Sequence, residues 1–138
     1  MTNEVDTFLS SWHRVVAAKD REALLGLLAE DVSLGAPPYY ERLQGRELVH
    51  HLLGLILHTI DEFTYHRQWQ NAGELALEFT GQVGDLQLQG IDLITLNDRF
   101  VIGNLDVLIR PASAVDALRD IIAPQMASFL SRAGQGAV

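Results

Sequence analysis

The sequence predicts an α+β fold in which helices gather on one side of a strongly curved antiparallel sheet. Apolar residues recur at helical spacing in the first sixty residues and again near the C-terminus. Residues 62–109 instead form four segments rich in β-branched and aromatic residues. Only short turn sequences separate these four segments, and connections that short force antiparallel neighbours.

Three helices are predicted in the N-terminal half. The first ends near Lys19, with Asn3 or Thr2 as its N-cap, and Asp20 can cap a second helix over residues 21–31. Residues 32–36 are predicted as a short strand, and the Pro-Pro-Tyr-Tyr sequence after them turns the chain. The third helix is predicted from Arg46 to Ile60. Its polar face is expected to carry Glu47, His51, Gly54 and His58.

Four strands are predicted after the third helix, over residues 62–70, 74–83, 86–96 and 99–109. The central strands carry apolar residues on both faces, so helices should cover one face. The other face is then expected to meet a partner subunit or to wrap a cavity. A C-terminal helical segment over residues 113–132 is predicted, with a break at Pro124.

Composition sets the class of protein. The 138 residues suit a single domain, expected over 1–133, with 134–138 as a flexible tail. A net charge of −8 argues against nucleic acid or an anionic membrane as partner. The chain contains no cysteine, and its start lacks the basic region of a secretory signal. The apolar runs are too short to span a bilayer, so a cytoplasmic location is expected.

Several segments in this order resemble the SnoaL-like proteins of the nuclear transport factor 2-like (NTF2-like) superfamily. They are LLAEDVSL, LQGRELVHHLLGLI, GIDLITL and VLIRPASAVDALRDII. The resemblance implies a cystatin-like, cone-shaped sheet closed by the helices, with one deep pocket and usually a homodimer. That fold hosts isomerases, epoxide hydrolases, cyclases, dehydratases and non-catalytic binding modules, so it does not select a reaction.

The sequence is similar to ketosteroid isomerase through AEDVSLGAP. The resemblance implies that Asp92 occupies the position of a protonated aspartate that donates a hydrogen bond to the substrate. Trp12 stands where that enzyme has a tyrosine, and Ala36 stands where it has its general base. Alanine cannot accept a proton, so that mechanism is not expected here.

The sequence also resembles limonene-1,2-epoxide hydrolase, through DVSLGAPPYYERLQGRELV and VIGNLDV. The resemblance implies that Asp106 occupies the position of its base. Its other catalytic positions hold residues without the required groups, namely Leu34, Ala36, Phe79 and Gly81. Each of the two related enzymes therefore matches this chain at one catalytic carboxylate: Asp92 for the isomerase and Asp106 for the epoxide hydrolase.

Asp92 and Asp106 each lie in the middle of an apolar predicted strand. If the two residues lie opposite each other, their side chains share one face about 5 Å apart. Two carboxyls that close in a dry pocket cannot both ionise easily, which would give a proton donor beside an acceptor. A register one residue different would instead place Asp106 on the other face, beside Arg110, Arg67 or water.

The remaining candidates each have two interpretations. Trp12 either turns its indole N–H into the cavity or packs in the core. Tyr39 belongs to a lid over an apolar ligand or to a loop at a dimer edge. His50 is the histidine of the third helix that flanks its apolar face. Phe63, Tyr65 and Trp69 are expected to share one face of their strand, with core packing favoured.

These observations favour a small-molecule-binding pocket protein with acid/base chemistry: epoxide hydrolysis, isomerisation or cyclisation of a compact apolar substrate. Asp106 would act as base and Asp92 as hydrogen-bond donor. The expected substrate-binding residues are Trp12, Leu34, Ala36, Tyr39, His50, Phe79 and Gly81. No metal site is expected, because no two histidines lie at helical i, i+4 spacing and the chain has no cysteine, and no cofactor is indicated. The alternative is a non-catalytic ligand-binding or dimerisation module whose cavity is filled by its own side chains.

Overall fold

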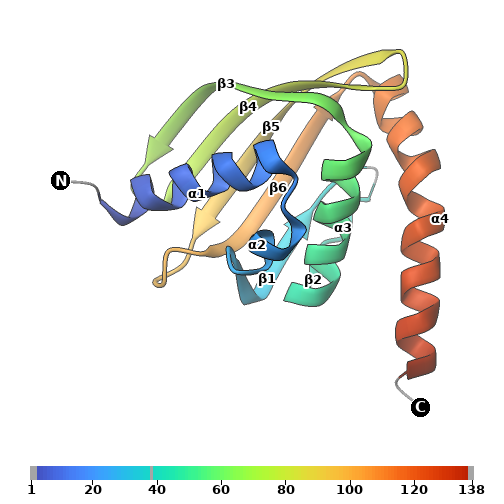
Figure 1. Ribbon diagram of the computed structural model, residues 1–138, viewed down its shortest axis with the longest axis horizontal. Coiled ribbons are helices and arrows are strands. Elements are labelled where there is room, and N and C mark those ends of the chain that lie inside the picture. The colour runs from blue at the N-terminus through green and yellow to red at the C-terminus, as the bar shows by residue number, and fades with distance from the viewer. Residues whose placement is uncertain (1–2, 38, 137–138) are drawn as a thin grey trace.

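The computed structural model, which describes residues 3–37 and 39–136, contains one curved six-stranded sheet that does not close (Figure 1). This architecture confirms the α+β prediction. The strand order is β2-β1-β6-β5-β4-β3, and neighbours are antiparallel except for the parallel pair β1 and β6. The elements are α1 (Glu4–Ala18), α2 (Arg21–Leu25), β1 (Leu28–Gly35), β2 (Leu43–Gln44), α3 (Arg46–Thr59), β3 (Asp61–Asn71), β4 (Glu74–Val83), β5 (Leu86–Leu96), β6 (Ile102–Arg110) and α4 (Ala112–Gly136).

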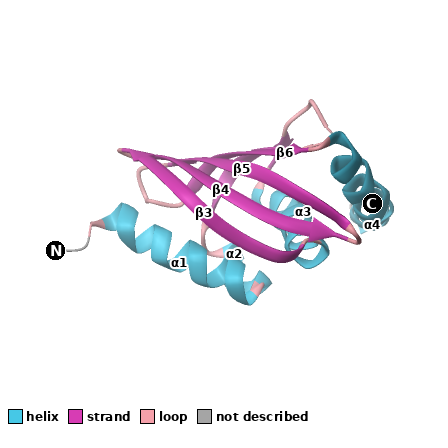
Figure 2. Cartoon of the chain, turned by 90° about the horizontal axis from the view of Figure 1, so that it is seen from above, coloured by secondary structure: helices cyan, strands magenta, loops and turns pink. Residues whose placement is uncertain are grey.

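The helices divide the sheet into an inner and an outer face. Figure 2 shows α1, α2 and α3 on the same side of the sheet, with α4 at one end beside α3. The core lies between these helices and the inner face, where Leu77, Ile94 and Leu105 are fully buried. Within the described part of the chain, no helix covers the opposite, outer face (Figure 2).

Side-chain caps define where the first two helices begin. The Asn3 side chain accepts a hydrogen bond of 2.8 Å from the Asp6 N–H, and Asp20 accepts one of 3.0 Å from Ala23. The C-cap of α1, Lys19, has a φ of 53°, in the left-handed region, which turns the chain toward α2.

Two of the predicted helices differ from those observed. The second helix was expected over residues 21–31 but ends at Leu25, because Leu28 pairs with Ile102 of β6 and starts β1. The third helix has Gly54 buried rather than on a polar face, beneath the side chain of Arg21. Pairing and packing with distant segments override the local helical pattern in both places.

The predicted break at Pro124 is also wrong, since α4 continues from Ala112 to Gly136. Proline removes one backbone donor, and the carbonyl left over belongs to the exposed Asp120, where water can bind it. Ala114, Leu118, Ile122 and Met126 are buried along one side of α4, which holds both halves of the helix in place. The predicted tail is helical as far as Gly136, and residues 137–138 lie outside the described residues.

A one-residue bulge at Gly103 sets the register between β5 and β6. Leu96 pairs with Ile102, but Thr95 pairs with Asn104, so Gly103 is left between the two pairs. Beyond the bulge, Leu93 pairs with Asp106 and Asp92 pairs with Val107. Side chains of paired residues share a face, so Asp92 and Asp106 point to opposite faces of the sheet. The hypothesis that the two carboxyls meet in one pocket is therefore wrong.

Asp106 lies on the outer face in a polar cluster around Arg42. The Arg42 guanidinium forms an ion pair with Asp106 and donates to the Asn104 side chain at 2.6 Å. Its Nε donates to Ser33 Oγ at 2.7 Å. The cluster ties the chain before β2 to β1 and β6. It lies directly over Gly35, where an added Cβ would be 2.8 Å from Arg42 Nη1.

Gly35→Ala should therefore destabilise the fold by about 1–3 kcal/mol, because the new methyl group displaces the Arg42–Asp106 pair. Gly26→Ala is the matched control: Gly26 has a φ of −71°, and its added Cβ would be 3.6 Å from the Ala23 carbonyl oxygen. It should leave stability unchanged or slightly higher. Urea denaturation of both variants checks this, and equal effects would contradict the packing described here.

Candidate functional site

A small enclosed cavity lies between α1, α3 and the inner face of the sheet. Its volume is about 30 Å³, which is room for little more than a water molecule. The lining residues are Trp12, Val16, Leu24, Leu53, Ile56, Leu57, Phe63, Tyr65, Phe79, Asp92, Leu105 and Val107. Asp92 contributes the one carboxyl group to this otherwise apolar and aromatic wall.

A chain of two hydrogen bonds leads from α1 to Asp92. Trp12 Nε1 donates to the Tyr65 hydroxyl at 2.9 Å, and that hydroxyl donates to Asp92 Oδ2 at 2.5 Å. Asp92 is 6% exposed, and its burial raises the pKa of the carboxyl to about 7, although the Tyr65 hydrogen bond lowers it in part. Burial and the neighbouring Asp92 raise the pKa of Tyr65 well above its usual range. The pair therefore carries one exchangeable proton near neutral pH.

Aromatic rings fix the position of Tyr65. Phe63 stacks on Phe79 with ring centroids 4.7 Å apart, and the Tyr65 ring meets Phe63 edge-on at 5.0 Å. Trp69 was expected on the same face, but the pairing of β3 with β4 shifts between Tyr65 and Gln68. The shift turns Trp69 to the outer face, where its side chain lies beside Arg67.

The structure brings three of the predicted site residues to the cavity: Trp12, Phe79 and Asp92. Six others do not line it. Leu34 and Ala36 are buried in the core, and Gly81 lies beneath Ile60. Tyr39 lines an apolar cleft together with residues of α3 and α4. The His50 ring donates a hydrogen bond of 2.6 Å to the Arg21 carbonyl. Asp106 is on the outer face, paired with Arg42.

Tyr65 is the functional residue that sequence reasoning missed. Phe63 and Tyr65 are two residues apart, so they share one face of the predicted strand, and core packing is the interpretation that the sequence favours for this face. The Tyr65 hydroxyl group was the available signal, because a tyrosine buried among apolar residues needs a hydrogen-bond partner. The partner, Asp92, is 27 residues away, on a strand that is not adjacent to β3.

Comparison with solved structures identifies the family. The chain is 31% identical to a steroid delta-isomerase from Pseudomonas aeruginosa, with a TM-score of 0.87 over 95% of this chain and 97% of that one. It is 38% identical to an uncharacterized protein with a cystatin-like fold from Silicibacter pomeroyi, with a TM-score of 0.82 over 86% and 84% of the two chains. An NTF-2 like protein from Burkholderia xenovorans shares the fold at 15% identity, with a TM-score of 0.66 over 77% and 82%. The chain belongs to the NTF2-like superfamily.

The NTF2-like assignment rests on these structures. A comparison with protein-family models finds no match, and neither does a comparison with curated protein sequences. The expected assignment to the SnoaL-like proteins within the superfamily stays a prediction, because the similar structures identify the superfamily and isomerase-like relatives.

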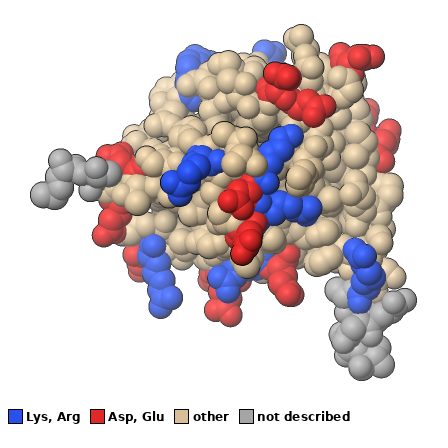
Figure 3. All heavy atoms as spheres, in the orientation of Figure 1, with Lys and Arg blue, Asp and Glu red and all other residues tan. Residues whose placement is uncertain are grey.

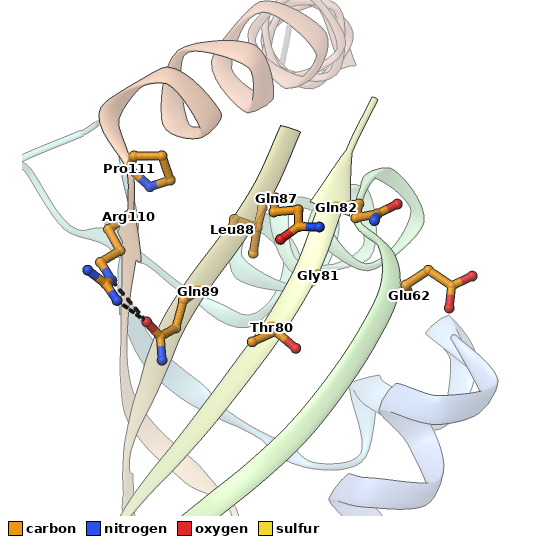
Figure 4. A pocket seen from close by; sticks show the side chains of 9 residues that line it. All are labelled: Glu62, Thr80, Gly81, Gln82, Gln87, Leu88, Gln89, Arg110 and Pro111. Carbon is orange, nitrogen blue, oxygen red and sulfur yellow. Dashed lines mark hydrogen bonds between the residues drawn. The ribbon is translucent and has the colours of Figure 1, made fainter. Parts of the chain in front are cut away.

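A second, open cleft of this NTF2-like chain lies at the end of the sheet near the start of α4 (Figure 4). Its volume is about 670 Å³, and residues of β4 and β5, four of them polar, make up most of its lining. Figure 4 shows the Arg110 guanidinium turned toward Gln89, to which it donates at 2.6 and 2.9 Å. Gly81 lines this cleft rather than the cavity. The cleft is larger than the cavity, but Asp92 and Tyr65 do not line it.

The described ranges, 3–37 and 39–136, contain no group of three or more His, Cys, Asp or Glu side chains placed to hold a metal ion. In the same part of the chain, none of the helices combines the length and hydropathy that crossing a membrane requires.

Asp92→Asn should change how stability depends on pH. Between pH 3.8 and about 7 the unfolded chain loses the Asp92 proton and the folded chain keeps it. The free energy of unfolding therefore falls as pH rises through this window, by up to about 1.4 kcal/mol per pH unit, and levels off above it. The amide variant lacks this slope.

Urea denaturation of wild type and Asp92→Asn across the window measures the difference between them. Arg67 lowers the pKa of Glu78 from 4.5 to about 2, so this carboxyl adds a slope of opposite sign up to about pH 4.5. That slope is the same in both proteins and cancels when their stability curves are subtracted. Parallel stability curves for the two proteins would contradict the assignment of a raised pKa to Asp92.

Proposed function

We propose that this NTF2-like protein binds a small, compact, largely apolar molecule against Asp92 and moves one proton on it, in an isomerase-type reaction. The observation that carries the proposal is the buried Asp92 carboxyl, hydrogen-bonded by Tyr65 in an aromatic cavity. The similarity to a steroid delta-isomerase, 31% identical over 95% of this chain, supports the same class of chemistry.

One carboxyl group is sufficient for such a reaction. Ionised Asp92 would remove a proton from the carbon between a carbonyl group and a double bond, leaving a dienolate. The protonated carboxyl would then return the proton to the far carbon of the former double bond, so that the group ends unchanged. A pKa of about 7 suits both steps, because the carboxyl accepts and releases a proton with similar ease near neutral pH.

The position of Asp106 favours isomerisation or cyclisation over epoxide hydrolysis. Hydrolysis needs a base for the attacking water and an acid for the epoxide oxygen, and the sequence offered Asp106 and Asp92 for these roles. Asp106 lies on the outer face and is paired with Arg42, so it does not share the cavity with Asp92. In this proposal Asp92 carries the proton, and Tyr65 and Trp12 position it.

A substrate needs more space than the observed cavity of about 30 Å³ provides. Movement of α1 would provide it. Three side-chain hydrogen bonds link the α1 segment to β3 and the end of α3: Trp12 to Tyr65 at 2.9 Å, His13 to Gln68 at 3.1 Å and Lys19 to the Ile60 carbonyl at 3.2 Å. The proposed reaction therefore includes an opening of α1 away from the sheet.

The small cavity favours a second candidate function. A non-catalytic binding or dimerisation module could have its cavity filled by its own aromatic side chains, as Phe63, Tyr65 and Phe79 fill most of this one. In that case Asp92 is a structural carboxyl that anchors Tyr65. The two candidates differ in whether any small molecule raises the melting temperature.

A thermal-shift screen with cyclic enones, steroids and epoxides, followed by an isomerisation assay, tests the proposal. With a β,γ-unsaturated cyclic ketone, formation of the conjugated product is followed by ultraviolet absorbance. Asp92→Asn should lower kcat at least about 100-fold, since it removes the proton carrier. In wild type the Tyr65 hydrogen bond lowers the pKa of Asp92. Tyr65→Phe removes this bond, so the pKa of Asp92 should rise and the acidic limb of the pH–rate profile should move to higher pH.

Asp106→Asn is the matched control, and its turnover should stay within about threefold of wild type. Full activity in Asp92→Asn would overturn the proposed mechanism. If no compound raises the melting temperature of the wild-type chain, the non-catalytic module is the better description.

We also propose that a second copy of the chain covers the outer face. Three large apolar side chains are exposed there: Trp69 at 47%, Leu93 at 40% and Leu108 at 57%. Four of the charged side chains around them are paired within one chain, as Arg67–Glu78 and Arg42–Asp106, and the remaining Glu74 and Arg110 carry opposite charges. Two such faces can therefore meet without strong repulsion between like charges.

Leu108→Arg should convert the proposed homodimer to a monomer, because it places two new unpaired charges in the interface. Leu130→Arg on α4 is the control, since Leu130 is similarly exposed, at 52%, but outside the sheet. Light scattering coupled to gel filtration measures the mass of each. A wild-type monomer would refute the dimer.

A further inference from the structure

Basic side chains from three helices converge on His51, on the side of α3 away from the cavity. Arg21 of α2 lies with its guanidinium against α3 at Gly54, where an added Cβ would be 2.7 Å from Arg21 Cζ. Gly54 is three residues after His51, so the two positions are neighbours on one face of α3. The small glycine thus holds a guanidinium beside the imidazole.

The helix α4 supplies the other side of this cluster. The rings of His51 and Phe129 stack with centroids 4.0 Å apart and planes at 11°. Arg132 follows Phe129 by three residues, which places it on the same face of α4. Arg21 and Arg132 therefore flank the stacked imidazole from two different helices.

The cluster lacks negative charge. Within the described residues, neither Arg21 nor Arg132 takes part in an ion pair, although the chain has 18 acidic and 10 basic residues. On the face drawn in Figure 3, acidic and basic side chains lie among one another. Among the described basic residues, ion pairs form at Arg42, Arg67 and Arg119, so what distinguishes Arg21 and Arg132 is their shared position beside His51.

His51 itself has an unused polar atom. Its Nε2 is buried and has no hydrogen-bond partner among the described residues. Burial, followed by Arg21, Arg132 and His50, lowers the pKa of the imidazole. His50 is occupied differently, since it donates to the Arg21 carbonyl at 2.6 Å and holds the start of α2 against α3.

We propose that Arg21, His51 and Arg132 form a binding site for a tetrahedral oxyanion, such as the phosphate group of a small molecule. The two guanidinium groups supply planar hydrogen-bond donors that suit phosphate oxygens. The third donor is Nε2–H of His51, which gains the partner that it otherwise lacks. The anion also offsets the repulsion between the cations, so binding favours the protonated imidazole.

Titration of the full chain with inorganic phosphate, followed by the histidine ring signals in NMR and by calorimetry, tests the site. The His51 signals should shift and saturate. Arg21→Gln and Arg132→Gln should each weaken binding about tenfold, as expected for the loss of one charged donor. Arg99→Gln in the β5–β6 turn changes the net charge equally and should leave the affinity within about twofold.

Two further measurements separate this site from general charge attraction. Sulfate should bind more tightly below the His51 pKa than above it, and bound sulfate should raise that pKa by the same linkage. Acetate, with one charge and a planar shape, should bind more weakly than phosphate. Unchanged His51 signals, or equal losses in Arg21→Gln, Arg132→Gln and Arg99→Gln, would overturn the proposal. Because no cavity residue is changed, the outcome is independent of the proposed isomerase activity.

Discussion

The one-residue bulge at Gly103 determines which carboxyl group lies inside the curved sheet and which lies outside. Before the bulge the strands follow the register of their turn, and beyond it every side chain of β6 is shifted by one position relative to β5. Asp92 then faces the helices, and Asp106 faces the polar cluster around Arg42. The core residues Leu105 and Val107 take the inner positions that this register leaves for them.

The burial of Asp92 links the helices to the sheet. Burying a carboxyl to 6% exposure costs free energy unless the group is neutral or hydrogen-bonded. The raised pKa favours the neutral form of Asp92, and the Tyr65 hydroxyl donates a hydrogen bond to it. Trp12 donates to the same hydroxyl, so α1 is attached to β5 through a side chain of β3. One hydrogen-bond chain therefore connects α1, Tyr65 and Asp92, while burial sets the raised pKa of the carboxyl.

The packing around Tyr65 also limits the space beside Asp92. The aromatic rings that fix Tyr65 also fill the space beneath α1, and a cavity of about 30 Å³ is what is left. The chemistry proposed at Asp92 therefore requires the proposed movement of α1, whose side-chain hydrogen bonds to β3 and the end of α3 are few. The oxyanion site proposed at His51 is on the other side of α3, which packs against both α2 and α4, and it does not need that movement.

The sequence by itself determined the class of fold, the four long strands, most helices and the Asn3 cap, because apolar periodicity and side-chain caps act over a few neighbouring residues. It also indicated Asp92, Trp12 and Phe79, which do line the cavity. Only the tertiary structure decided the end of α2, the continuity of α4 through Pro124 and the face of Trp69, since pairing and packing with distant segments set them. The position of Asp106 belongs to the same group: a single extra residue in one strand reverses its direction, and strand alternation cannot reveal where a bulge will form.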